Sequence, residues 1–300
     1  MSEIIPLGRW VDRSVHYLLD HDAAAFDSIG KVIESFAALV EHSLQAFPMW
    51  TLMAFFIGIG FWRVGWRFAI FAALSLWLIY ATGFWDQTVV TLGLTLSSTL
   101  ISLLFGIPLG IWTARSEKVA MVVRPILDVM QTMPAFVYLI PAAMLFGLGR
   151  VPGILSTVIF AMPPAVRLTS LGIRHVNREI VEAGQAFGCT TWQLLYKVQC
   201  PNALPSIMQG VNQTIMLALS MVIIASMVGA GGLGNDVLAS IQRLDIGLGF
   251  ESGLSVVLLA IILDRITESF GRSPGAASAR PFAGLRSVMR IRRERQVAQG

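Results

Sequence analysis

The chain has 300 residues, of which 55% are hydrophobic and only 13% are charged, and its net charge at pH 7 is +4. Because a soluble domain carries about 25% charged residues, this chain lacks enough charge to cover a water-exposed globule of its size. The composition excludes an ordinary soluble protein and indicates a membrane protein with room for roughly six to eight spans of about 20 residues each.

Charge is distributed unevenly along the chain. Residues 1–47 carry three basic and seven acidic side chains, whereas residues 267–300 carry seven arginines and two glutamates. An arginine-rich end also occurs in nucleic-acid-binding proteins, but in a membrane protein it is typical of a cytoplasmic tail. We therefore expect no nucleic acid partner and interpret the asymmetry as a signal of orientation.

Seven apolar runs, of which only the last contains charged residues (Asp264 and Arg265), follow the first 47 residues, which contain two amphipathic stretches with helical spacing. We expect the two stretches to form extramembrane or interfacial helices and each run to span the membrane. The predicted fold is an all-α polytopic membrane protein with about seven transmembrane helices. The runs cover residues 48–62, 68–85, 87–114, about 129–149, 151–166, about 209–228 and about 252–266.

Basic residues alternate between the connections that join these runs. Arg63 and Arg67 separate the first two runs, and further basic residues follow the third, the fifth and the seventh. Because basic loops stay in the cytoplasm, we expect the N-terminus outside and the C-terminus inside. Arg150, in a short outer connection, is the exception to this pattern.

The segment between the fifth and sixth runs is the longest predicted internal cytoplasmic loop and has helical signals. Asn177 is a suitable N-cap, Glu179 would stand in the first turn, and Gly188 is a typical stop. The apolar face of this short helix consists of Ile180, Ala183, Gly184 and Phe187.

A second short helix should follow the glycine. Thr190 and Gln193 have the spacing of a capping box, and Pro201 should end the helix. Such a unit on the membrane face can fit the groove of a soluble partner or rest on lipid headgroups. The residues alone leave both interpretations open.

This segment also resembles the EAA signature of binding-protein-dependent ABC importer permeases, which is E-A-A, three residues, G, nine residues, I-x-L-P. In that family the loop forms a coupling helix that docks on a separate ATPase subunit. The resemblance implies that residues 172–201 are an ATPase-coupling loop with Phe187 on its docking face. The matching residues are Glu182, Ala183, Gly188 and Pro201, and the small or apolar replacements are Gly184, Val198 and Cys200.

Three further stretches, residues 131–139, 211–221 and 229–234, resemble the glycine betaine, proline betaine and choline branch of this family. The likeness covers about residues 85–270 and implies a type I permease core formed by the last five helices, in residues 86–270. An acidic extracytoplasmic segment, 1–47, and two accessory helices, 48–85, would precede it. Residues 271–300 are expected to be a basic, disordered cytoplasmic tail.

The resemblance implies a permease subunit of an ATP-driven importer in the bacterial inner membrane, with choline, glycine betaine or proline betaine as cargo. The alternatives are an ABC permease for another small solute such as an amino acid, and an ion-coupled secondary transporter. The implied partners are a second permease copy, two ATP-binding subunits, an extracytoplasmic solute-binding protein and membrane lipid. ATP and Mg would bind the ATPase, so we expect no cofactor on this chain.

The chain lacks the signatures of several competing functions. The central runs of the first six spans carry no ionisable side chain, although ion-coupled carriers usually place such groups there. Neither GxxxxGK[ST] nor HExxH occurs. We therefore expect neither an ATPase nor another enzyme, and no catalytic or metal-binding residue.

Small polar side chains form a stripe along the third run. Thr91, Thr95 and Ser98 share one helix face with Thr88 and Ser102. Hydroxyl groups in such a stripe can line a wet pathway, or they can allow close helix packing, which is the commoner role in membranes.

The sixth run carries amides, which need partners because unsatisfied polar groups are costly in hydrocarbon. A translocation pathway or a dimer seam would satisfy them equally well. The candidate residues are Gln209, Asn212, Gln213 and Ser220.

Four glycines follow at the predicted outer end of the same run. They permit backbone shapes that other residues resist. The segment is either a gate hinge or an ordinary helix end. Its glycines are Gly229, Gly231, Gly232 and Gly234.

Overall fold

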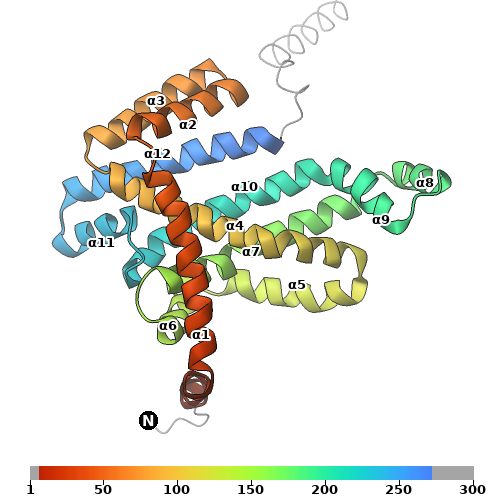
Figure 1. Cartoon of the computed structure of the whole chain (residues 1–300), viewed down its shortest axis with the longest axis horizontal. Helices are drawn as coiled ribbons and strands as arrows, with labels where there is room; N and C mark the ends of the chain where they lie inside the picture. Colours follow the sequence, from red (N-terminus) through yellow and green to blue (C-terminus); the bar gives the residue numbers. More distant parts are fainter. Residues whose placement is uncertain (1–6, 272–300) are drawn as a thin grey trace, which may run out of the picture.

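The computed structural model describes residues 7–271, with side chains from residue 24 onward, and this part of the chain is helical throughout (Figure 1). The predicted tail lies outside the described residues, apart from Gly271. In chain order the elements are α1 (Leu7–Gln45), α2 (Met49–Arg63), α3 (Trp66–Ala81), α4 (Trp85–Arg115), α5 (Glu117–Thr132), α6 (Ala135–Phe146), α7 (Arg150–Arg174), α8 (Arg178–Ala186), α9 (Thr191–Gln193), the π-helix η1 (Leu194–Gln199), α10 (Cys200–Ala225), the 3₁₀ helix η2 (Ser226–Val228), α11 (Leu233–Arg243) and α12 (Ile246–Gly271).

The centre of the fold is the bundle of α4, α7 and α10, whose backbones approach closely at glycines. A Cβ atom at Gly110 on α4 would lie 2.7 Å from Cβ of Thr169 on α7, and one at Gly210 on α10 would lie 3.2 Å from Cβ of Leu168. Lipid tails are as apolar as leucine, so membrane helices associate through this kind of close contact rather than through the hydrophobic effect. The glycines therefore determine how near the three helices lie.

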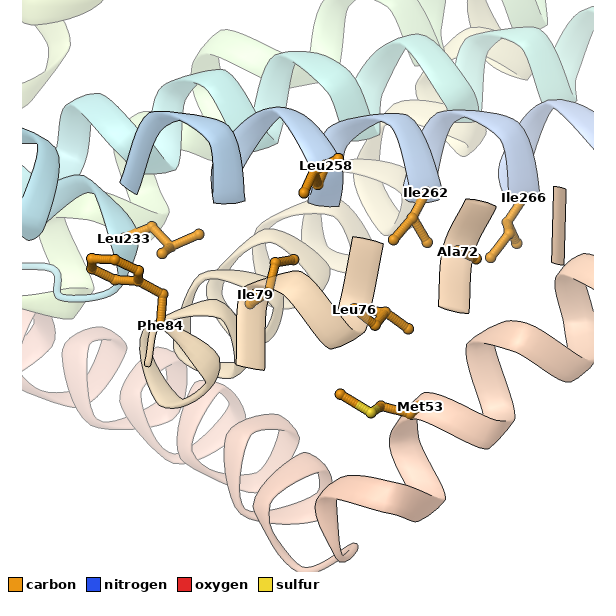
Figure 2. Packing of buried hydrophobic residues seen from close by; sticks show 9 residues of the cluster. All are labelled: Met53, Ala72, Leu76, Ile79, Phe84, Leu233, Leu258, Ile262 and Ile266. Atoms are coloured by element: carbon orange, nitrogen blue, oxygen red, sulfur yellow. The ribbon is translucent and has the colours of Figure 1, made fainter. Parts of the chain in front are cut away.

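The accessory hairpin α2–α3 packs on α12 at one side of the bundle (Figure 2). At its turn, Arg63 donates a hydrogen bond of 3.1 Å to the carbonyl oxygen of Ser269, and its guanidinium lies 4.5 Å from the ring centroid of Phe270. The hairpin is thus fixed at the end of α12. The buried residues between them are Met53, Ala72, Leu76, Ile79, Phe84, Leu233, Leu258, Ile262 and Ile266.

The number of candidate spans is smaller than the seven predicted. Among the described residues, four helices are long and apolar enough to cross a membrane: α4, α7, the continuous helix Thr191–Val228 and α12. Two bent helix pairs raise the number to 6 if each pair is one span. α3 has only 16 residues, about 24 Å of helix, and falls short of the roughly 30 Å hydrocarbon core.

The fourth predicted span, about residues 129–149, is not one straight helix. α5 and α6 meet at an angle of 97°. The break lies at Met133, whose extended backbone (ψ 137°) is the conformation favoured before a proline, and Pro134 then begins α6. The chain is therefore fully broken before Pro134, whereas Pro141 lies within α6.

The N-terminal segment differs from the two helices predicted, because α1 is continuous over 39 residues. The run of alanines at 23–25 joins the two amphipathic stretches, and alanine has the highest helix propensity. α1 crosses α4, α6 and α7 (Figure 1), and the Glu41 carboxylate forms an ion pair of 2.6 Å with Arg150. The basic residue that broke the charge pattern thus has a partner on the acidic segment.

Replacing Gly110 by valine should lower the stability of the bundle. The new side chain would meet Thr169 and the carbonyl oxygen of Val166 at 2.7 and 2.8 Å, and overpacking of this kind costs about 1–3 kcal/mol. Thermal unfolding in detergent measures the loss. Gly58→Val is the control, since nothing lies within 4 Å of a Cβ atom there. Equal melting of both variants would contradict the close packing of α4 and α7.

Candidate functional site: the segment between α7 and α10

The predicted coupling segment stands at one end of the molecule, and α6 and α11 lie at the other end (Figure 1). α9, η1, α10 and η2 form one continuous helix of 38 residues, Thr191–Val228. At 1.5 Å per residue this helix is about 57 Å long, which is well beyond the roughly 30 Å of a hydrocarbon core. The helix is therefore longer than a single span requires, and the segment stands at one end of it.

The first helix of the segment has the predicted caps. Asn177 is the N-cap of α8, and its side chain accepts a hydrogen bond of 3.0 Å from the N–H of Glu179. Gly188 follows the helix with φ +78°, a conformation that favours glycine. α8 is therefore a short, well-defined helix with fixed ends.

The second helix begins as predicted but does not end at Pro201. Thr190 and Gln193 form a complete capping box, with hydrogen bonds of 2.9 and 3.4 Å. Pro201 is the second residue of α10 and lies inside the continuous helix, directly after the π-helix η1. The π-helix η1 connects α9 to α10, so the predicted stop is the first turn of the next helix.

Gly184, at the position where the signature has alanine, faces inward. A Cβ atom there would lie 2.8 Å from Cδ1 of Leu194 on η1 and 3.4 Å from Cγ2 of Val198. The glycine therefore allows α8 to pack against η1. Its role is internal packing, whereas the predicted apolar face of α8 is only partly available to a partner.

Aromatic side chains dominate the exposed surface of the segment. The Phe187 side chain is 89% exposed, and Trp192 and Tyr196 are 64% and 63% exposed with stacked rings 6.0 Å apart. The Arg115 guanidinium lies 5.0 Å from the Trp192 ring centroid and links the end of α4 to α9. The sequence analysis missed Trp192 and Tyr196, although their i, i+4 spacing was a visible signal.

A polar cavity of about 580 Å³ separates α8 from the ends of α4 and α7. Arg174 closes its inner side, because it donates a hydrogen bond of 2.6 Å to the Thr113 carbonyl and pairs with Glu117 on α5. The end of α7 is thus fixed to α4 and α5, while α8 stands clear of them. The lining residues include Arg115, Arg178, Glu182, Gln185 and Gln199.

The polar stripe of α4 lies inside the bundle of a single copy. Thr91, Thr95 and Ser98 have no exposed surface. The Thr95 hydroxyl donates to the Thr91 carbonyl at 2.7 Å, and the Ser98 hydroxyl has no partner in the described structure. This placement matches the packing interpretation, and a contact of the stripe with cargo stays a prediction.

The glycine segment at the opposite end is held against α4. The Leu233 N–H donates a hydrogen bond of 2.8 Å to the Thr91 hydroxyl, and a Cβ atom at Gly232 would lie 2.4 Å from the same oxygen. Gly229 and Gly231 also have positive φ angles, of 87° and 93°. The segment reverses the chain into α11 with tight contacts, and its use as a hinge stays a prediction.

Two further features lie beside this turn. Gly234 allows a close approach, because a Cβ atom there would lie 2.4 Å from Oγ of Ser226. On the same α11, burial raises the pKa of the Asp236 carboxyl, and a hydrogen bond from its own backbone N–H acts in the opposite direction. This end of the molecule therefore contains a desolvated carboxyl near the glycines.

The polar residues of α10 divide into two groups. Asn212 points to α12, where its side chain donates to Oδ1 of Asp264 at 2.9 Å and accepts a hydrogen bond from Thr267. The other three are exposed in the single chain: Gln209, Gln213 and Ser220. The structure thus assigns Asn212 to a helix contact and leaves the other side chains exposed to a pathway or a second copy, although the Ser220 hydroxyl also donates to the Met216 carbonyl.

Among the described residues, no group of three or more His, Cys, Asp or Glu side chains is placed to hold a metal ion.

Comparison with known proteins identifies relatives over most of the chain. Residues 106–273 match the family described as "Binding-protein-dependent transport system inner membrane component". The chain is 48% identical to the glycine betaine/carnitine transport permease protein GbuB of Listeria monocytogenes, over 89% of this chain and 96% of that protein. It is 46% identical to the glycine betaine/proline betaine permease protein ProW of Escherichia coli, over 90% of this chain and 76% of that protein. The glycine betaine permease protein OpuAB of Bacillus subtilis is 45% identical, over 88% and 94%.

A solved structure has the same fold. A chain of the MetNI methionine ABC transporter in an inward-facing conformation superposes with a TM-score of 0.55 at 24% identity. The likeness covers 65% of this chain and 97% of that one.

Replacing Thr91 by valine should destabilise the turn into α11. The Leu233 N–H would lose its acceptor in a buried position, which costs about 1–3 kcal/mol. Thr88→Val is the matched control, because the Thr88 hydroxyl bonds only the Phe84 carbonyl one turn before it. Thermal unfolding and hydrogen exchange at residue 233 compare the two. If they behave alike, the Thr91 contact does not hold the segment.

Proposed function

The chain belongs to the family of binding-protein-dependent transport system inner membrane components, and on this premise we propose that it is the permease subunit of an ATP-driven importer of quaternary ammonium solutes. As such a component it is a multi-pass inner membrane protein and not itself an ATPase. The importer also requires an ATPase and a solute-binding protein.

The cargo we propose is glycine betaine or a close relative such as proline betaine, carnitine or choline. Support comes from three relatives that are 45–48% identical over at least 88% of this chain and whose names all include glycine betaine. The choice among these solutes rests with the binding protein. An amino acid cargo is the alternative, and an uptake assay with competing solutes separates the two.

The observation that carries the mechanism is the unbroken helix from Thr191 to Val228. It connects the exposed aromatic surface around Trp192 directly to the glycine segment at the other end. In the proposed mechanism, an ATPase subunit holds α8 and the Phe187 ring, and its closure moves α8. A packed helix then transmits the displacement as a rigid element, which switches the permease between outward-open and inward-open states.

The proposed assembly contains two copies of this chain and two ATPase subunits in the lipid bilayer. The exposed amides of α10 support a contact with the second copy, because polar groups in hydrocarbon need partners. We place the N-terminus outside, α8 in the cytoplasm and the C-terminus inside, which requires an odd number of spans and therefore that the short helix α3 also crosses the bilayer. The charge pattern supports this orientation, and the Glu41–Arg150 pair gives the outer Arg150 an acidic partner.

Replacing Phe187 by alanine should disrupt the docking of the ATPase. A central interface aromatic contributes about 2 kcal/mol or more, so association should weaken roughly thirtyfold. Uptake of radiolabelled glycine betaine and ATPase association are measured in proteoliposomes with the ATPase and the binding protein. Phe250→Ala, which removes a ring that is 70% exposed at the start of α12, is the matched control.

Two outcomes of this experiment would contradict the proposal. Normal ATPase association of the Phe187→Ala variant would show that α8 is not the docking site. If the unaltered chain takes up glycine betaine without ATP, and if collapse of the proton gradient stops that uptake, it is an ion-coupled carrier instead.

The two cysteines of the chain, Cys189 and Cys200, both lie in the coupling segment and report its side of the membrane. A membrane-impermeant maleimide should label Cys189 in inverted membrane vesicles and leave it unlabelled in intact spheroplasts. A Cys189→Ser variant identifies the labelled site. Labelling of Cys189 in intact spheroplasts would place α8 on the outer side of the membrane, where no ATPase can bind it, and would contradict the proposal.

A further inference from the structure

α5 carries charged side chains on a surface that cannot face lipid. Asp128 on α5 forms an ion pair of 2.5 Å with Arg167 on α7, and the two side chains are 67% and 41% exposed. Arg167 lies seven residues before Arg174, about 10 Å further along α7 and away from the projecting end. Charged groups at membrane depth are costly unless they face a water-filled space or another part of the protein. This surface is therefore suited to a water-filled space or to a protein contact, and not to lipid.

A cavity of about 420 Å³ lies between α5 and α7 at this surface. It combines charges of both signs with apolar side chains. Within the described part of the chain Arg124 forms no ion pair, so its guanidinium is free for a ligand. The lining residues include Arg124, Leu127, Asp128, Arg167, Leu168 and Leu171.

The cavity adjoins the exposed polar face of α10. Leu168 lines the cavity and also lies against Gly210, where a Cβ atom would be 3.2 Å from Cβ of Leu168. Gln209 and Gln213 are exposed on either side of Gly210 along α10. Leu168 of α7 thus links the charged lining of the cavity to the helix that carries the exposed amides.

We propose that this cavity is a transient binding site for a zwitterionic cargo near the cytoplasmic end of the translocation pathway. The proposal rests on the function proposed above and locates the cargo on this chain. The cargo carboxylate would accept hydrogen bonds from Arg124, whose planar fork suits a carboxylate. The quaternary ammonium group has no N–H, so it needs only a nearby carboxylate and apolar contacts, which Asp128 and Leu171 supply.

The charge pattern distinguishes this occupant from simpler ones. A ligand with only a positive charge would be repelled by Arg124 and Arg167, and a ligand with only a negative charge would be repelled by Asp128. A molecule with both charges matches both parts of the lining. Because the Asp128–Arg167 pair already satisfies part of the lining charge, binding is weak, as release into the cytoplasm requires.

The test measures binding without the solute-binding protein. The purified permease–ATPase complex in nanodiscs is titrated with glycine betaine and followed by saturation-transfer difference NMR. Loss of one charge-assisted hydrogen bond in Arg124→Gln should weaken binding about tenfold, and Asp128→Asn should act in the same direction. Arg124→Lys, which keeps the charge but loses the planar fork, should retain only part of the binding. Tetramethylammonium and acetate, each with one of the two charges, should both bind more weakly than glycine betaine.

Lys118→Gln is the matched control, because it removes an exposed positive charge from the same helix outside the cavity. All variants must elute with the ATPase subunit as the unaltered complex does. Equal glycine betaine signals in the unaltered, Arg124→Gln and Asp128→Asn complexes would overturn the site, as would the absence of any signal. Uptake by the unaltered complex with binding protein and ATP is measured separately, so a missing site and a wrong proposed function give different results.

Discussion

Close approach of helix backbones is the constraint on which the rest of the molecule depends. In hydrocarbon the hydrophobic effect does not drive helices together, so contact area must come from small residues at the crossing points. Gly110 and Gly210 allow this close contact where α4 and α10 pack against α7. This packing buries the hydroxyl stripe of α4 and brings Thr91 to the glycine turn. The rigidity required of the long helix Thr191–Val228 follows from the same contacts.

Much of this arrangement could be predicted from local sequence. The caps at Asn177 and Thr190 depend on residues within three positions, and the structure confirms them. The apolar runs indicated an all-α membrane protein, because a long apolar run without charge is typical of a transmembrane helix. The short helix between Asn177 and Gly188 was also predicted from its local signals, and its role in coupling stays a proposal.

The remaining features depend on contacts between distant residues, which local patterns do not contain. Arg150 was an exception to the charge pattern of the sequence, and the structure explains it by an ion pair with Glu41, which lies more than a hundred residues away along the chain. Gly184 was assigned to an exposed face, but its contact with Leu194 is internal. Pro201 was read as a stop because proline usually is one, and the preceding π-helix permits the chain to continue. In each case a tertiary contact or an irregular turn decided the outcome.

The π-helix η1 also sets how far one end of the helix Thr191–Val228 is rotated about the helix axis relative to the other end. An α-helix rotates by about 100° per residue, whereas the wider π turn accommodates extra chain without advancing the helix by a full step. Trp192 lies on one side of this turn, and the buried stripe of α10 that begins at Ala203 lies on the other. A regular α-helix of the same number of residues would carry Trp192 further around the axis, by roughly the 100° of the residue that the π turn absorbs. The π-helix thus determines the direction in which the aromatic surface faces relative to the bundle.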